Sequence, residues 1–138
     1  METQYKEFES LVMASKLDNI TVAESLVDLV CKELSVKEDF YGNILIAVTE
    51  AVNNAIKHGN LSDPTKEVKL SVLDAENHID IIVSDEGTGF DYTSLPDPTA
   101  PENIEKEHGR GIFLMSSLAD YVEFENGGNT VRMTFAKG

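Results

Sequence analysis

The stretch TEAVNNAIKHGN (residues 49–60) places three polar side chains at intervals of four within an otherwise apolar segment. In a helix, with about 100° per residue and roughly 6 Å of rise over four residues, Glu50, Asn54 and His58 follow one edge of the apolar stripe. The stripe consists of Ile44, Val48, Ala51 and Ala55, widened by Leu45, Val52 and Ile56. The spacing therefore predicts a polar ridge, at the border of core and surface, whose side chains converge on one ligand.

Two other interpretations of this ridge remain open. A solvated helix flank, in which polar pairs four residues apart support the helix, explains an isolated ridge without any ligand. His58 in addition suits capping of carbonyls at a helix end. A zinc site is disfavoured, because Asn is a weak zinc ligand and no Cys or second well-spaced His accompanies it. If a metal is bound, carboxylate and amide oxygens favour Mg²⁺.

A second motif, VSDEGTGF (residues 83–90), ends an apolar strand with the pattern D-x-G-x-G. Asp85 can accept a hydrogen bond from an exocyclic amine such as that of adenine. Gly87 and Gly89 let the backbone approach a flat ring with no Cβ in the way. Taken by itself, the motif is weak, and an ordinary β-turn explains it better.

A third motif, EHGRGIFLM (residues 107–115), places Gly109 and Gly111 on either side of Arg110, just before a predicted helix. Free amides at a helix start, beside a guanidinium, form an anion site suited to phosphates. A hinge with a surface arginine is the alternative. A dinucleotide-binding turn is disfavoured because these glycines follow a proline-containing loop instead of a strand, and a GKS or GKT phosphate loop is absent.

Composition limits the class of protein. The 138 residues, 41% of them hydrophobic, suffice for one domain with a two-layer core. A formal charge of −14, from 25 acidic and 11 basic side chains, opposes unaided binding to nucleic acid or anionic lipid. It favours a basic protein partner, although solubility alone would also explain it. The N-terminus lacks a signal-peptide pattern and no apolar run approaches about 18 residues, so we expect no membrane contact and a cytoplasmic location.

Apolar periodicity predicts an α+β chain in which helices and strands segregate. The predicted strands are residues 5–13, 66–74, 77–84, 121–125 and 130–136, and the predicted helices are residues 20–34, 36–58 and 111–118. The first strand alternates loosely and is expected at a sheet edge. This order predicts a two-layer sandwich, a mostly antiparallel mixed sheet with its helices on one face. The single cysteine, Cys31, is expected to be a buried small hydrophobe.

Local signals set the predicted boundaries. SVKE, with Ser35 and Glu38 as a capping box, is expected to start the long helix, and Gly59 to end it in a positive-φ conformation. NGGN (residues 126–129) supplies positive-φ residues for a tight hairpin. Residues 91–108 hold three of the four prolines and are expected to form a long functional or disordered loop.

The three motifs in this order resemble the histidine-kinase-like ATPase (Bergerat) fold of the GHKL superfamily, which gyrase, Hsp90-type chaperones and histidine kinases share. The likeness covers nearly the whole chain. It implies a single ATP-binding domain over residues 1–138, with a mobile ATP lid at about 91–108. Within the superfamily, TEAVNNAIKHG and HGRGIFLMSSLADYVEF are similar to the anti-sigma factor serine kinases of bacterial partner switching.

This resemblance implies a role for each matching residue. Asn54 would hold the Mg²⁺ that bridges the ATP phosphates, and Asp85 would contact the adenine amine. Glu50 would be the general base, accepting the proton of a serine on the antagonist protein. The remaining site residues would be Gly87 and Gly89 beneath the base, Gly109, Arg110 and Gly111 around the phosphates, Thr130 near the base, and His58 beside phosphate or substrate. For Thr130, an ordinary β-branched strand residue is an equally good interpretation.

One position departs from the family pattern. The best-known members carry a basic residue in the lid, just ahead of the glycines, that reaches the γ-phosphate. Here those positions are Glu107 and His108. Arg110 or Lys106 can substitute if either reaches the phosphate. If neither does, we expect slow phosphoryl transfer with ATP binding retained.

The implied function is that of an ATP- and Mg²⁺-dependent anti-sigma factor with serine kinase activity. Its partners would be a sigma factor and a STAS-type anti-sigma factor antagonist, and a homodimer is expected from the family. One alternative is an ATP-gated binding module of the same fold without kinase activity. Another is a detached histidine-kinase catalytic domain, which is disfavoured because 138 residues leave no room for a phosphoacceptor helical hairpin.

Overall fold

The computed structural model describes residues 4–88 and 107–138, and for residues 107–110 it describes the backbone alone. Within these residues the chain forms one five-stranded sheet with the spatial order β1-β2-β3-β5-β4. Every strand pairing is antiparallel, so the sheet is not mixed. The strands are β1 (Lys6–Ala14), β2 (Glu67–Asp74), β3 (His78–Ser84), β4 (Tyr121–Glu125) and β5 (Thr130–Ala136).

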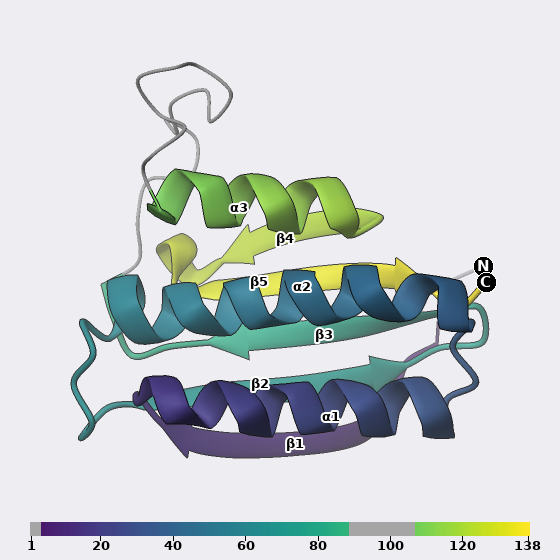
Figure 1. The fold of residues 1–138 in the computed structure, drawn as a ribbon, viewed down its shortest axis with the longest axis horizontal. Helices are drawn as coiled ribbons and strands as arrows, with labels where there is room; N and C mark the ends of the chain where they lie inside the picture. Colours follow the sequence, from purple (N-terminus) through teal and green to yellow (C-terminus); the bar gives the residue numbers. More distant parts are fainter. Residues whose placement is uncertain (1–3, 89–106) are drawn as a thin grey trace.

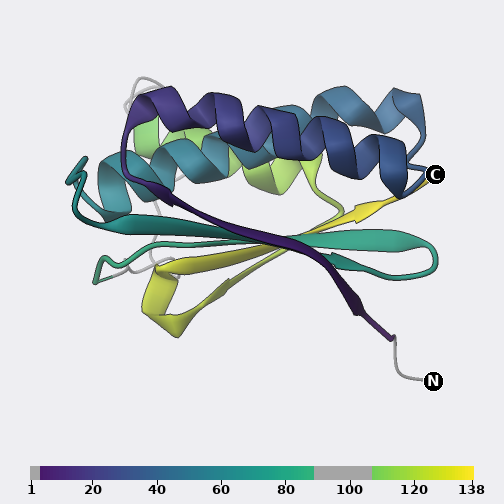
Figure 2. The same cartoon turned by 90° about the horizontal axis from the view of Figure 1, so that it is seen from below.

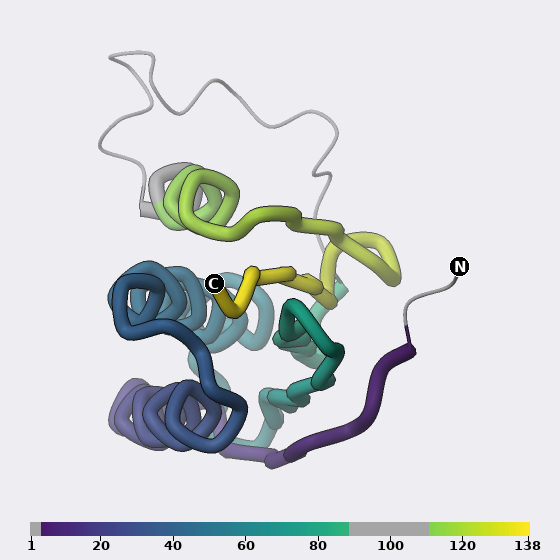
Figure 3. Tube along the Cα trace, turned by 90° about the vertical axis from the view of Figure 1, so that its right-hand side faces the viewer, coloured from purple at the N-terminus to yellow at the C-terminus, as the bar shows by residue number. Residues whose placement is uncertain are grey.

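Three α-helices of the described residues cover one face of this sheet. They are α1 (Ile20–Glu33), α2 (Glu38–Asn54) and α3 (Glu107–Leu118). Figure 1 shows them side by side, with α2 between α1 and α3. Figures 2 and 3 show the helices as one layer and the twisted sheet as the other. The predicted two-layer α+β sandwich is confirmed, and β1 lies at a sheet edge as expected.

The core lies between the two layers because alternate strand residues point to the helices. On β2, Val68, Leu70 and Val72 are completely buried, whereas Lys69 between them is exposed. The same alternation on β3 and β5 buries Ile79, Ile81, Val83, Val131, Met133 and Phe135. This period of two also explains why the strand boundaries follow the predicted ones closely.

The predicted capping box at Ser35 is wrong. Ser35 has a φ of 56°, and α2 begins only at Glu38 without any side-chain cap. The amide of Val36 instead donates to the carbonyl of Cys31 over 3.1 Å, which is the closing hydrogen bond of a Schellman motif. Ser35 is the left-handed residue of that motif, so it ends α1 and does not start α2. Cys31 itself is partly buried against the core.

The end of the long helix also differs from the prediction. Regular α2 stops at Asn54, and residues Ala55–Gly59 continue as a turn of π-helix, in which the Asn60 amide donates to the Ala55 carbonyl over 2.8 Å. Gly59 does not have the positive φ that was expected. Single π-turns are often found at functional sites. The reason for a glycine here is a close contact with another segment, described below.

The third helix starts earlier than residue 111. It begins at Glu107, so Gly109 and Gly111 lie inside its first turns and not ahead of them. The predicted lid at 91–108 and Gly89 fall mainly on residues 89–106, which lie outside the described residues. The NGGN hairpin has positive φ at Asn126, Gly127 and Gly128, as predicted. Among the described helices, none has the length and apolar content needed to span a membrane.

Candidate functional site

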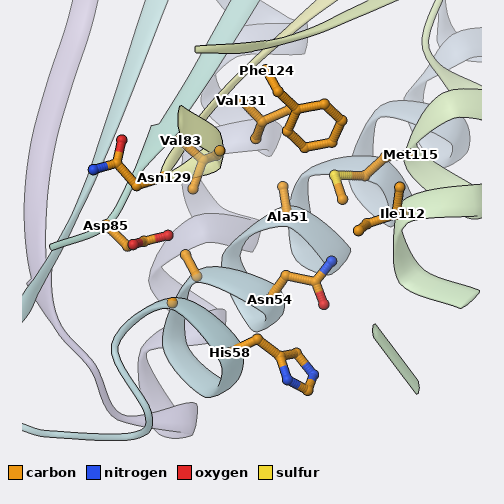
Figure 4. A pocket seen from close by; sticks show the side chains of 13 residues that line it. Ala51, Asn54, His58, Val83, Asp85, Ile112, Met115, Phe124, Asn129 and Val131 are labelled. Carbon is orange, nitrogen blue, oxygen red and sulfur yellow. The ribbon is translucent and has the colours of Figure 1, made fainter. Parts of the chain in front are cut away.

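A cavity opens between the C-terminal end of α2, the end of β3, the start of β5 and helix α3. Figure 4 shows Asp85 on one side of it and Asn54 on the other. The residues that line it are Ala51, Asn54, Ala55, His58, Gly59, Val83, Asp85, Ile112, Met115, Phe124, Gly128, Asn129 and Val131. The polar ridge and the D-x-G turn, which the sequence singled out separately, therefore meet in one place.

Asn54 is the most unusual side chain of this cavity. It is only 9% exposed, yet neither its Oδ1 nor its Nδ2 has a hydrogen-bond partner among the described residues. Burying an amide without a partner costs about 1–3 kcal/mol, so native structures rarely do so without a functional reason. Its carbonyl oxygen is a suitable ligand for a hard cation such as Mg²⁺.

Glu50 lies one turn before Asn54, next to residues that line the cavity. A Cβ added to Gly111 would come within 2.9 Å of Glu50 Oε2 and 3.1 Å of Asn54 Nδ2, so α3 passes directly over both side chains. On its other side, Glu50 lines a groove of about 370 Å³. The other residues of this groove are Ile20, Glu24, Leu45, Ile46, Thr49 and Asn53. The Glu50 carboxylate thus lies beneath α3 beside Asn54, and the residue also lines an open groove on the α1–α2 face.

Asp85 is held rigidly at the end of β3. Its amide donates to the Asn129 carbonyl over 2.9 Å, and its Oδ1 accepts from the amide of Gly87 over 2.7 Å. Burial raises the pKa of the Asp85 carboxyl, and the Gly87 amide and the charge of Lys66 offset part of this rise. A partly desolvated carboxylate with a fixed orientation is suited to accept from one ligand donor.

Two glycines allow α2 and the D-x-G turn to meet backbone to backbone. A Cβ on Gly59 would come within 2.6 Å of Asp85 Oδ1, and a Cβ on Gly87 would come within 2.9 Å of the same oxygen and overlap the Gly59 carbonyl. Gly59 is therefore required by this close approach and not by its φ. Sequence reasoning could not find this reason, because the contact joins distant parts of the chain.

We expect Gly59→Ala to lower the free energy of unfolding by about 2 kcal/mol, because the added methyl group overlaps the Asp85 carboxylate. The matched control is Gly42→Ala in α2, where an added Cβ meets nothing within 4 Å. That change should stabilise the protein by about 0.5–1 kcal/mol through helix propensity. Chemical denaturation measures the free energy of unfolding of both variants and so tests the two expected changes. Equal shifts in the two would contradict a close contact at Gly59.

Much of the remaining wall is apolar. Val83 and Val131 from the sheet, Phe124 from β4, and Ile112 and Met115 from α3 surround the space beside Asp85 (Figure 4). Such a slot, with one fixed carboxylate at its side, suits a flat heterocycle that carries an exocyclic amine. From the sequence, these apolar residues were placed only in strands or in the last helix, and the structure shows that they also face a ligand-sized space.

The other predicted residues are placed as follows. His58 lines the cavity and is exposed. Thr130 is buried beside the cavity, with its Oγ1 3.2 Å from Ser84 Oγ and 3.1 Å from Asn129 Oδ1. Of Gly109 and Arg110 only the helical backbone is described, so their contact with phosphate stays a prediction. Gly89, predicted beneath the adenine base, lies outside the described residues, and its role also stays a prediction.

Two asparagines of the site were missed. Asn129 lies in the NGGN stretch and was interpreted only as part of a turn, although it lines the cavity and its carbonyl holds Asp85. Asn60 closes the stretch TEAVNNAIKHGN and is completely buried. The available signal was a polar residue directly after a predicted helix end. A turn residue gives the same signal, and nothing local distinguishes the two.

Comparison with known proteins assigns the chain to a class. The model of the histidine kinase-like ATPase domain family matches residues 13–135. This match spans most of the chain, and the chain therefore belongs to that family. The resemblance stated from the sequence, and the fold that it implies, are confirmed.

Individual relatives narrow this class. The serine-protein kinase RsbW of Oceanobacillus iheyensis is 27% identical over 126 residues, which cover 87% of this chain and 80% of that protein. The RsbW proteins of Bacillus subtilis and Staphylococcus aureus are 34% and 38% identical over 99 residues. These two matches cover 67% and 64% of this chain, and 62% and 61% of the relatives, which is less than two thirds of each relative's length.

A solved structure shows the same fold. It contains the RsbU and RsbW domains of a Mycobacterium tuberculosis protein and superposes with a TM-score of 0.56 at 12% identity. The superposition covers 94% of this chain and 31% of that one. At this identity the likeness concerns the fold alone.

Proposed function

We propose that this protein is an ATP-dependent protein serine kinase that also acts as an anti-sigma factor. The observation that carries this proposal is the shared cavity, which has the unpartnered buried amide of Asn54 on one side and the fixed carboxylate of Asp85 on the other. Membership of an ATPase family makes ATP its nucleotide. The similarity to proteins named serine-protein kinase supports transfer to a serine.

The nucleotide lies with its adenine beside Asp85 and its phosphates near Asn54. The Asp85 carboxylate accepts from the adenine amine, and the apolar wall packs against the ring. Backbone amides at the start of α3, which passes over Asn54, face the phosphates and are aided by the helix dipole. Gly87 lies beneath the adenine base, the family resemblance implies the same role for Gly89, and Thr130 and His58 border the site.

Mg²⁺ fits the residues present. Asn54 Oδ1 is buried and free to coordinate, and Mg²⁺ in kinases takes few protein ligands besides phosphates and water. No group of three or more His, Cys, Asp or Glu side chains able to hold a metal occurs in residues 4–88 or among the described side chains of α3, β4 and β5. When bound, the ion would neutralise charge on the β- and γ-phosphates.

Glu50 is the general base. A serine hydroxyl that enters from the α1–α2 groove meets the Glu50 carboxylate on the side away from Asn54. The serine oxygen attacks the γ-phosphorus of ATP. The bond between that phosphorus and the oxygen that bridges it to the β-phosphate breaks, and ADP leaves. The serine proton passes to Glu50. The products are phosphoserine and ADP, and positioning supplies most of the remaining rate enhancement.

The protein substrate is a STAS-type anti-sigma factor antagonist, and a sigma factor is the second partner. A formal charge of −14 favours a partner with a basic or mixed surface and speeds their encounter at low salt. The groove combines apolar Ile20 and Ile46 with acidic Glu24 beside the base. It therefore suits a serine-bearing segment with an apolar and a basic side chain. We propose that the protein acts as a homodimer, as its family resemblance implies.

Incubation with γ-labelled ATP and a purified STAS-domain antagonist tests this function. We expect Mg²⁺-dependent label on a serine of the antagonist, and none when EDTA is present. Partner binding that requires ATP but yields no labelled antagonist would instead support an ATP-gated binding module. Absence of any ATP binding would contradict the proposed site itself.

We expect Asn54→Ala to weaken binding of MgATP by about 10- to 100-fold, because it removes the buried amide oxygen placed to hold the metal. The unliganded variant should be at least as stable as the wild type, since an unpaired buried amide is lost. The neighbouring Asn53→Ala, which does not line the cavity, is the control for nucleotide binding. Calorimetric titration with and without Mg²⁺ checks both. Equal affinity in the two variants would remove Asn54 from the site.

A further inference from the structure

Asn60 is a completely buried polar residue to which no role has yet been given. Its Nδ2 donates to Ser15 Oγ over 2.7 Å and to the Glu67 carbonyl over 2.9 Å, and its Oδ1 accepts from the amide of Glu86 over 2.8 Å. Both amide hydrogens are thus used. A buried amide with this complete set of partners fixes the segments that it joins.

One of these segments is the turn that carries Asp85. Glu86 follows Asp85 directly, and Asn60 holds its amide from the α2 side, while Asn129 accepts from the amide of Asp85 on the β5 side. Gly59, which precedes Asn60, lies against the Asp85 carboxylate. The D-x-G turn is therefore clamped between two elements, and Asn60, which directly follows the π-turn at the end of α2, accepts a hydrogen bond from its backbone.

The clamp joins the two halves of the nucleotide site. Asn54, on the phosphate side, belongs to α2, and Asp85, on the adenine side, follows β3. A rigid nucleotide requires a fixed separation between these groups, and errors of about 1 Å in such placements cost about 100-fold in rate. Asn60 extends from the end of the segment that carries Asn54 to the turn that carries Asp85.

We propose that Asn60 is a positioning residue that sets the selectivity of the site for adenine. It does so by holding the Asp85 turn at a fixed place relative to Asn54. The proposal rests on the proposed function, since it assumes that Asp85 reads the exocyclic amine. A purely structural Asn60 would affect stability but would leave base selectivity unchanged, and this difference makes the proposal testable.

Ser15→Ala provides a matched control. Ser15 is as buried as Asn60, belongs to the same hydrogen-bond network and donates to the Lys66 carbonyl over 2.7 Å, but none of its described hydrogen bonds reaches the turn at Asp85. Both substitutions remove buried hydrogen bonds and should lower the melting temperature. Only Asn60→Ala removes the partner of the Glu86 amide.

The affinities for MgATP and for MgITP, which lacks the exocyclic amine, are measured in the wild type and both variants below their melting temperatures. We expect the preference for ATP to fall about 10-fold in Asn60→Ala and to stay within about two-fold of wild type in Ser15→Ala. Retained preference in Asn60→Ala would overturn the inference. Hydrogen exchange of the Glu86 amide in the nucleotide-free wild type tests the clamp without any ligand or variant. Protection supports it, and exchange as fast as that of exposed Thr88 refutes it.

These readouts separate this inference from the proposed function. If the wild type bound no ATP, the kinase proposal would fail, whereas the exchange of the Glu86 amide would still decide whether Asn60 holds the turn. If ATP binds with clear preference over ITP, the function survives whatever Asn60→Ala shows. Failure of Asn60→Ala to fold leaves the exchange measurement on the wild type as the deciding result.

Discussion

We expect Glu50→Gln to lower phosphoryl transfer to the antagonist by about 10²- to 10⁴-fold while ATP binding is kept. The amide has nearly the same shape as the carboxylate but cannot accept the serine proton. The affinity for ATP should be equal or higher, because a negative charge near the triphosphate is removed. Transfer of label from γ-labelled ATP, measured under single-turnover conditions, separates the chemical step from binding.

A suitable control for this substitution is Glu38→Gln, at the opposite end of the same helix. Glu38 is exposed in the first turn of α2 and far along the helix from Asn54. Its neutralisation changes the net charge by the same amount and weakens only the favourable interaction with the helix dipole, worth about 0.3–1 kcal/mol. If Glu50→Gln transferred the phosphoryl group at the wild-type rate, a group other than Glu50 would have to accept the serine proton.

The strands could be predicted well from the sequence because their signal is local. Alternation of apolar and polar residues on β2 and the positive-φ residues of the NGGN hairpin are set by near neighbours. The error at Ser35 arose where two local motifs compete for the same residues. A capping box and a Schellman motif both suit SVKE, and the hydrogen bond from Val36 back to Cys31 decides between them.

The site could be predicted only in part, for a different physical reason. Glu50, Asn54 and His58 share a helix edge, and their four-residue spacing is enough to predict this from the sequence. The contact of Gly59 with Asp85 and the clamp from Asn60 to Glu86 depend on how α2 docks against the end of β3. Contacts between distant segments produce no periodic pattern in the sequence. A single residue that makes such a contact therefore cannot be distinguished, from the sequence, from an ordinary turn residue.

Substitution of Asp85 should affect ATP binding and stability in opposite directions. We expect Asp85→Asn to weaken ATP binding by about 100-fold, because a charge-assisted hydrogen bond to the adenine amine is lost. The nucleotide-free variant should nevertheless melt at or above the temperature of the wild type at neutral pH. Burial raises the pKa of Asp85, so the folded protein binds its proton more tightly than the unfolded chain does, and ionising this carboxyl destabilises the fold.

The sign of this effect predicts its pH dependence. The destabilisation by Asp85 develops as the pH rises from the ordinary carboxyl value, near 4, through the raised pKa of the folded state. The stability difference between Asp85→Asn and wild type should therefore be largest at neutral pH and should vanish below about pH 4, where both side chains are neutral. Thermal unfolding across this pH range tests the predicted change in stability, and titration with MgATP tests the predicted loss of affinity. A variant that loses stability at neutral pH and keeps ATP affinity would show that Asp85 serves the fold instead of the ligand.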